Sequence, residues 1–153
     1  APIVERMLRC AELRPHHLVL EPSAGRGAIA LPAARISERV DCYELQCENA
    51  VALRAVADEH MTVVGPIDFL TLDPEPIYDR VLMNPPFAKQ ADARHILHAL
   101  KSLVPGGRLV AIASNAVTVR YCDSRALGDR TLRPSVGPGA NSKACRSKSF
   151  KGA

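Results

Sequence analysis

Short apolar runs alternate with segments of helical periodicity over the first 115 residues, and this alternation constrains the fold more than any other feature. Apolar residues at spacings of three and four indicate helices, whereas short apolar runs bounded by turn residues indicate buried strands. Strands that alternate with helices form βαβ units and a parallel sheet. The run 109–113 is apolar on both faces, which fits a sheet covered by helices on both sides. We therefore predict a doubly wound, mostly parallel α/β fold.

The same pattern places the individual elements. Arg14-Pro15 is expected to end the first helix, because proline disfavours helix at the residue before it. Pro105-Gly106-Gly107 is expected to separate the last helix from the last strand. The predicted helices cover residues 3–13, 27–37, 49–59 and 91–103, and the predicted strands cover residues 17–20, 40–43, 61–64, 79–83 and 108–113.

The composition changes near residue 115. Residues 1–115 carry 12 Lys+Arg against 14 Asp+Glu, whereas residues 116–153 carry 8 against 2 and are rich in Ser, Gly and Pro. The later segment has little apolar surface to offset the entropy of ordering it. We expect residues 1–115 to form one domain, with 116–153 a basic tail that is partly disordered or the truncated end of that domain.

Several protein classes are disfavoured by the sequence. It has no apolar run of the ~20 residues that a membrane span needs, and its N-terminus does not resemble a signal peptide. Its five cysteines form no CxxC pair, which argues against a disulfide framework and a metal site. We expect a cytoplasmic protein with no membrane partner and no metal.

A loop with two glycines follows the first predicted strand, in the order Glu21-Pro22-Ser23-Ala24-Gly25-Arg26-Gly27. Glycine allows a tight turn and a close ligand, and the next helix directs its N-terminus at an anion. Glu44 ends the second predicted strand, where a carboxylate can accept hydrogen bonds from both hydroxyls of a ribose. Ligands of open α/β sheets bind at the carboxyl ends of the strands, so these residues predict a ligand site.

Two cofactors, NAD and S-adenosylmethionine, are candidate ligands of this loop. Residues 25–30 satisfy the dinucleotide pattern G-x-G-x-x-A, which is weak evidence by itself. Glu21 opposes NAD, because its carboxylate would repel a pyrophosphate. S-adenosylmethionine offers an ammonium group for Glu21, a carboxylate for the helix N-terminus and a ribose for Glu44. A glycine turn without a ligand is the remaining alternative, and the acids at both strand ends argue against it.

Asn84-Pro85-Pro86-Phe87 follows the fourth predicted strand and is the most specific signal in the chain. The prolines cannot donate backbone hydrogen bonds, so they end the strand and fix the carbonyl directions. The Asn84 side-chain oxygen and the Pro85 carbonyl can both accept from one NH₂ group, and Phe87 offers a face for stacking. Accepting both hydrogens leaves the nitrogen lone pair free to attack a sulfonium methyl group. A plain strand-ending turn is the alternative interpretation.

These motifs resemble class I S-adenosylmethionine-dependent methyltransferases of the amino-methylating branch marked by (N/D/S)-P-P-(Y/F/W), with adenine-N6 DNA methyltransferases the nearest. The resemblance covers residues 2–115 and implies that Asp68-Phe69 lies beside the cofactor adenine, with Asp68 near its amino group. The cofactor-binding residues it implies are Glu21, Pro22, Ser23, Ala24, Gly25, Gly27, Glu44, Leu45, Asp68, Phe69 and Asn84. The catalytic residues it implies are Asn84, Pro85, Pro86 and Phe87.

The resemblance implies methyl transfer to an exocyclic amino group, with adenine N6 in DNA favoured and a nucleic acid as partner. Ribosomal RNA (guanine N2 or adenine N6) and a protein glutamine amide are alternative acceptors, because each presents a planar NH₂ group. A non-catalytic cofactor-binding fragment is the alternative from another class, and a nicotinamide dehydrogenase ranks last. Base-reading domains of the DNA enzymes have no counterpart here, so a separate recognition domain or subunit is expected.

Two further features stand outside these motifs. Family members usually complete a seven-stranded sheet with an antiparallel hairpin after the fifth strand, but only about 38 poorly apolar residues follow here. His95 and His98 lie three residues apart on the last predicted helix. A ligand held by both is one interpretation, and a partly exposed helix surface is favoured because no third ligand is in view.

Overall fold

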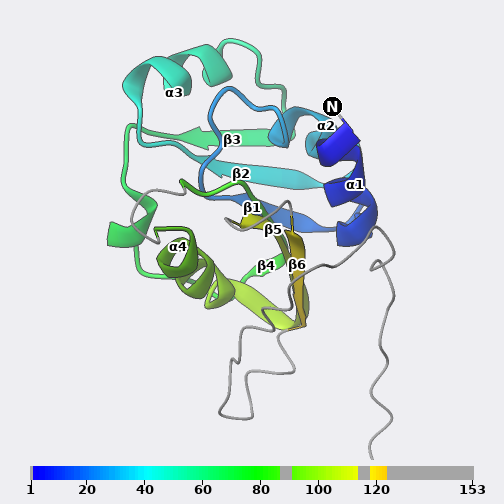
Figure 1. The fold of residues 1–153 in the computed structure, drawn as a ribbon. Coiled ribbons are helices and arrows are strands. Elements are labelled where there is room, and N and C mark those ends of the chain that lie inside the picture. Colours follow the sequence, from blue (N-terminus) through cyan, green and yellow to red (C-terminus); the bar gives the residue numbers. More distant parts are fainter. Residues whose placement is uncertain (1, 87–90, 114–117, 124–153) are drawn as a thin grey trace, which may run out of the picture.

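A six-stranded sheet with helices on both faces organises the computed structural model, which describes residues 2–86, 91–113 and 118–123 (Figure 1). The helices are α1 (Pro2–Ala11), α2 (Ala30–Ala34), α3 (Cys47–Arg54) and α4 (Ala91–Leu100), with a short 3-10 turn η1 (Phe69–Thr71). The strands are β1 (Leu18–Glu21), β2 (Arg39–Tyr43), β3 (Met61–Val64), β4 (Tyr78–Met83), β5 (Leu103–Ala113) and β6 (Thr118–Asp123).

The strand order is β3-β2-β1-β4-β5-β6, with β1 to β5 parallel and β6 antiparallel to β5. The predicted doubly wound α/β fold is therefore confirmed. Chain order reverses at β1, where Val19 pairs with Val40 of β2 on one side and with Arg80 of β4 on the other. In such sheets this switch point opens a crevice at the carboxyl ends of the strands.

Each face of the sheet carries its own hydrophobic cluster. One joins α1, α2 and α3 to the sheet through side chains such as Met7, Ala33 and Leu53. The other packs Phe69 of η1 and Leu100 of α4 against the opposite face. Figure 1 shows α1 and α2 on one side of the sheet and α4 on the other. Because both faces of the sheet are covered, most residues of the central strands are apolar.

Several predicted elements have different bounds, among them α3, which ends at Arg54 and not at 59. Helix α2 is shorter than 27–37; Pro32 lies within it, and the Ser37 hydroxyl hydrogen-bonds the Ala33 carbonyl at 2.8 Å, which competes with further helix. Helix α4 ends at Leu100 and β5 begins at Leu103, not at 108. The segment Pro105-Gly106-Gly107 was predicted as a separating turn, but it forms an irregularity inside β5, where the register with β4 shifts.

Strand β6 was not predicted at all. It lies within the segment expected to be a basic tail, and its Tyr121 pairs with Val110 of β5. Thr118, Val119 and Tyr121 favour extended backbone, and an edge strand needs fewer apolar residues than a central one. The sheet therefore continues beyond residue 115. Within the described residues, no helix has the length and apolar character required to cross a bilayer.

Candidate functional site

The loop after β1 turns on two glycines with left-handed backbone. Gly25 has φ 55° and Gly27 has φ 87°, a region that residues with a Cβ rarely adopt. A Cβ on Gly27 would also lie 2.6 Å from Cδ1 of Leu53 on α3. Glycine at position 27 thus serves both the turn and the close packing of α3. Both glycines have the left-handed backbone conformation that allows the tight turn expected of this loop.

Glu44 joins this loop to the end of β2. Its Oε2 accepts a hydrogen bond from the Gly25 N–H at 2.7 Å, and its Oε1 accepts from the Gln46 N–H at 2.7 Å. The side chain is buried, with the residue 7% exposed. Each carboxylate oxygen keeps a lone pair, because an ionised carboxylate accepts about four hydrogen bonds. Glu44 can therefore hold the loop in place and still accept from ligand hydroxyls.

Glu21 ends β1 and is the most unusual group of the site. The residue is 2% exposed, one carboxyl oxygen accepts from the Ala30 N–H at the start of α2, and Oε2 has no hydrogen-bond partner within the described part of the chain. Burial raises the pKa of Glu21 well above its ordinary value; the Ala30 N–H opposes this shift, and the charge of Glu44 adds to it. A buried carboxyl oxygen without a partner is costly, so the position of Oε2 calls for a cationic ligand group.

The rest of the predicted loop lies around these two acids. Pro22 and Ala24 are buried and Ser23 is half-buried, and the Ala24 N–H donates to the Tyr43 carbonyl at 3.0 Å. Leu45, next to Glu44, is 65% exposed. An exposed leucine beside a buried acid offers an apolar surface on which a planar ring can lie. The loop and the end of β2 are thus brought together as predicted.

Asp68 and Phe69 form a corner between β3 and β4. The exposed Asp68 accepts from the Leu70 N–H through Oδ1 at 2.9 Å and so begins the turn η1. Phe69 is buried, and its ring lies 5.8 Å from that of Tyr43 at the end of β2. The corner therefore packs against the strand that carries Glu44, on the side of the site where the sequence analysis expects an adenine.

Asn84-Pro85-Pro86 leaves β4 at the carboxyl edge of the sheet. Because Leu20 pairs with Val81, Asn84 follows β4 at the same edge at which the glycine loop follows β1. Asn84 and Pro86 are exposed, whereas Pro85 is fully buried. Burial of Pro85 anchors the motif and leaves the Asn84 side chain open to a ligand. Phe87, the fourth predicted catalytic residue, lies outside the described residues.

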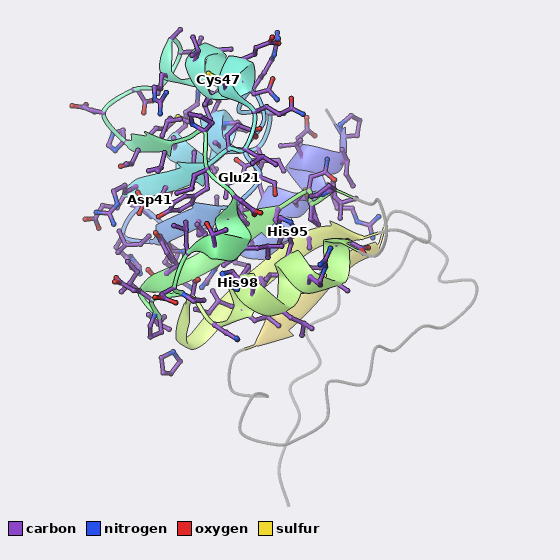
Figure 2. All side chains as sticks on the ribbon, turned by 90° about the vertical axis from the view of Figure 1, so that its left-hand side faces the viewer. Glu21, Asp41, Cys47, His95 and His98 are labelled. Atoms are coloured by element: carbon purple, nitrogen blue, oxygen red, sulfur yellow. The ribbon has the colours of Figure 1, made fainter. Side chains whose placement is uncertain are left out.

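Histidines of α4 border the site, a relation that the sequence analysis did not establish. His95 and His98 both contact the ring of Phe69, and the Nδ1 atom of His95 is buried without a hydrogen-bond partner among the described residues. Figure 2 shows the two histidines on α4. Burial lowers the pKa of His95; the charge of Asp68 acts in the opposite direction. The three-residue spacing was the available signal. Among the residues described, no group of three or more side chains could hold a metal ion.

Comparison with known proteins places this geometry among methyltransferases. Residues 5–131 match the methyltransferase small domain family. An rRNA methyltransferase of Streptomyces thermotolerans is 38% identical over 90 residues, which are 58% of this chain and 30% of that protein. The chain thus spans less than a third of the length of this relative.

Solved structures show the same fold. The 23S rRNA methyltransferase ErmE superposes with a TM-score of 0.59 at 26% identity, over 72% of this chain and 45% of that one. An RNA methyltransferase from Salinibacter ruber, solved with S-adenosyl-L-homocysteine, superposes with a TM-score of 0.56 at 23% identity, over 72% of this chain and 73% of that one. An O-methyltransferase from Thermotoga maritima gives a TM-score of 0.62 at 18% identity, over 74% and 44%.

Proposed function

The chain belongs to the methyltransferase small domain family, and from this premise we propose that it transfers the methyl group of S-adenosylmethionine to an amino nitrogen of a nucleobase. The observation that carries the proposal is Glu21, a fully buried carboxyl whose Oε2 has no partner at the carboxyl end of the central strand. An ammonium group is the ligand chemistry that stabilises such a carboxylate.

The residues around Glu21 fit the rest of this cofactor. Glu44 has lone pairs left to accept from ribose hydroxyls, and the exposed Leu45 lies next to it. In this proposal the Asp68–Phe69 corner, which packs against Tyr43 at the end of β2, contacts the adenine, and the Asp68 carboxylate accepts from the adenine amino group. A nicotinamide dinucleotide fits less well, because its pyrophosphate would meet the buried acid.

Asn84 and Pro85 would bind and orient the acceptor amine. When bound, S-adenosylmethionine supplies an electrophilic methyl group on a sulfonium. The Asn84 side-chain oxygen and the Pro85 carbonyl accept one N–H each, which directs the nitrogen lone pair at that methyl carbon. The new N–C bond forms as the S–C bond breaks, its electron pair stays on sulfur, and the extra nitrogen proton leaves to solvent. Phe87 is proposed to stack on the base.

RNA is the acceptor that the relatives favour. The Streptomyces relative is an rRNA methyltransferase, and ErmE acts on 23S rRNA by its name. We therefore propose ribosomal RNA in place of the adenine-N6 DNA acceptor that the motifs favoured. The modified atom, a guanine N2 or an adenine N6, follows from the same amino-group chemistry and is left to the experiment.

The test is methyl transfer from S-adenosylmethionine labelled at the methyl group. The protein is incubated separately with unmethylated ribosomal RNA, DNA and a cell protein extract, with Asn84→Ala as the blank. We expect label in the RNA and none with the variant. Label in DNA or protein alone would overturn the RNA assignment. Cofactor binding without label in any pool would favour a cofactor-binding fragment that needs a further recognition domain or subunit.

A further inference from the structure

Phe69 is held by two histidines from another element. Its ring lies 6.4 Å from that of His95 with the planes at 28°, and 5.0 Å from that of His98 with the planes at 87°. The first pair is stacked and the second is edge-to-face, the two arrangements that aromatic rings prefer. Both histidines come from α4, whereas Phe69 belongs to η1, so the contacts join two segments that are separate in the sequence.

His98 is itself fixed. Its Nε2 lies 2.9 Å from the carbonyl oxygen of Leu72, directly after η1. Because a carbonyl only accepts, this nitrogen must carry the proton and donate. His98 thus holds the Phe69 ring from one side and the end of the same turn through a backbone hydrogen bond.

The Phe69 ring also borders a cavity. Phe69 and His98 both line a cavity of about 230 Å³ between the sheet, the segment after η1 and α4. A cavity supplies no atoms for dispersion contacts, so the neighbours around it carry more of the contact with the ring. Among the described residues, its third aromatic neighbour is Tyr43, at 5.8 Å. The two histidines therefore add ring contacts from α4 to those that Phe69 makes in the cluster against the sheet.

One atom of His95 lowers the stability of the fold. Its buried Nδ1 has no partner among the residues that the structure describes, and an unsatisfied buried polar atom destabilises a fold. A phenylalanine at this position would stack on Phe69 without that cost. A group that costs stability at the border of a binding site is typical of selection for function.

We propose that His95 and His98 are positioning residues of the cofactor site, which hold Phe69 and the Asp68–Phe69 corner in the orientation that receives the cofactor adenine. The inference rests on the proposed function, because it takes this corner as the adenine side of the site. It also gives α4 a role in the site beyond covering the sheet. The helix begins seven residues after Asn84, so it follows the proposed catalytic motif in sequence, and its histidines contact the cofactor corner.

The test is calorimetric titration of the whole chain with S-adenosylhomocysteine. We expect His95→Ala and His98→Ala each to weaken binding about fivefold, the effect of losing one modest interaction. His60→Ala is the matched control, because the Nδ1 of His60 also lies near a backbone carbonyl, that of Glu38 at 3.0 Å, but away from this corner. The control should bind like the wild type.

Aromatic replacements separate positioning from general support of the fold. His95→Phe keeps the stacked ring, so it should restore binding and melt at or above the wild-type temperature. His98→Phe keeps a ring but loses the bond to Leu72, so its affinity should lie between those of the wild type and the alanine variant. In turnover, the alanine variants should raise KM for the cofactor and leave kcat at saturation nearly unchanged.

Three results would overturn the inference. They are wild-type affinity in both alanine variants, an equal loss in His60→Ala, or lower melting temperatures with unchanged affinity. Failure of the wild type to bind the cofactor would instead overturn the proposed function. The two failures are thus distinguishable in one set of titrations.

Discussion

Polar side chains at the amino edge of the sheet have hydrogen-bond partners within the protein, whereas a buried acid at the carboxyl edge has an oxygen without one among the described residues. At the amino ends of the strands, Arg80 and Arg108 donate to the last carbonyl groups of α1, Arg108 pairs with Glu12, and the Asp79 carboxylate accepts from the Leu18 N–H. At the carboxyl ends, Glu21 is buried with an unpartnered oxygen.

The difference separates stability from binding. Cationic groups at the C-terminus of a helix satisfy its free carbonyls and favour its dipole, so the amino edge stabilises α1 on the sheet. A buried acid with an unpartnered oxygen destabilises the free protein, and that oxygen gains a partner when a ligand binds. Substitutions at the carboxyl edge should therefore change binding and turnover, and substitutions at the amino edge should change the free energy of unfolding.

The largest effect is expected at Asn84. Asn84→Ala removes an acceptor for the substrate amine, so methyl transfer should fall about 100-fold or more, as when a single oriented polar group is removed from other active sites. Cofactor affinity should stay nearly unchanged. Labelled methyl transfer and calorimetry measure the two quantities. Near-normal turnover in the variant would show that Asn84 does not have this role.

Glu21→Gln should give the next largest effect. It replaces the proposed partner of the cofactor ammonium by a neutral amide of similar size. A hydrogen bond to a charged group contributes about 1.5–3 kcal/mol, so cofactor affinity should fall roughly 10- to 150-fold. The melting temperature should not fall, because the acid has an unpartnered oxygen in the free protein. A large loss of stability with unchanged affinity would contradict the ligand role of Glu21.

Arg108→Met tests the opposite edge. The variant loses the hydrogen bond from Nη1 to the Cys10 carbonyl at 2.8 Å and the ion pair with Glu12 at 2.9 Å. The free energy of unfolding should fall by about 1–2 kcal/mol in urea titrations. Cofactor affinity should equal that of the wild type. A loss of affinity without a loss of stability would remove the distinction between the two edges.

Glu12→Gln should have the smallest effect. The Glu12 side chain is 57% exposed, so the ion pair with Arg108 contributes no more than about 0.5 kcal/mol. The hydrogen bond and charge of Arg108 lower the pKa of Glu12. Its stabilisation is therefore present above the unfolded pKa, near 4.3, and is lost as pH falls through the lower folded value. The free energies of unfolding of the variant and the wild type should become equal below that pH.

The sequence predicted the architecture well because burial imposes it. Short, largely apolar runs bounded by turn residues marked β1 to β4, and the acids at the ends of β1 and β2 and the Asn-Pro-Pro turn after β4 lie at one edge, as the parallel topology requires. Sequence order alone could place these residues because parallel strands align their carboxyl ends.

The missed features depend on contacts between distant segments. Strand β6 is set by its pairing with β5, and the Pro-Gly-Gly segment lies within β5 because β4 pairs with β5 on both sides of it, at Leu103 and at Arg108. The contacts of His95 and His98 with Phe69 span more than 25 residues of sequence. Residue type and spacing mark such positions as candidates, but only the packed structure shows which side chain meets which.

The proton balance of cofactor binding tests the central claim most directly. Burial raises the pKa of Glu21 in the free protein, whereas an ammonium ligand favours the ionised form and so lowers that pKa. Calorimetric titration with S-adenosylmethionine, repeated in buffers of different ionisation enthalpy, should show proton release and an affinity that increases as pH rises toward the raised pKa. Glu21→Gln should bind weakly and release no proton at this position. Tight binding with the same proton balance in both proteins, or no binding by the wild type, would contradict the account.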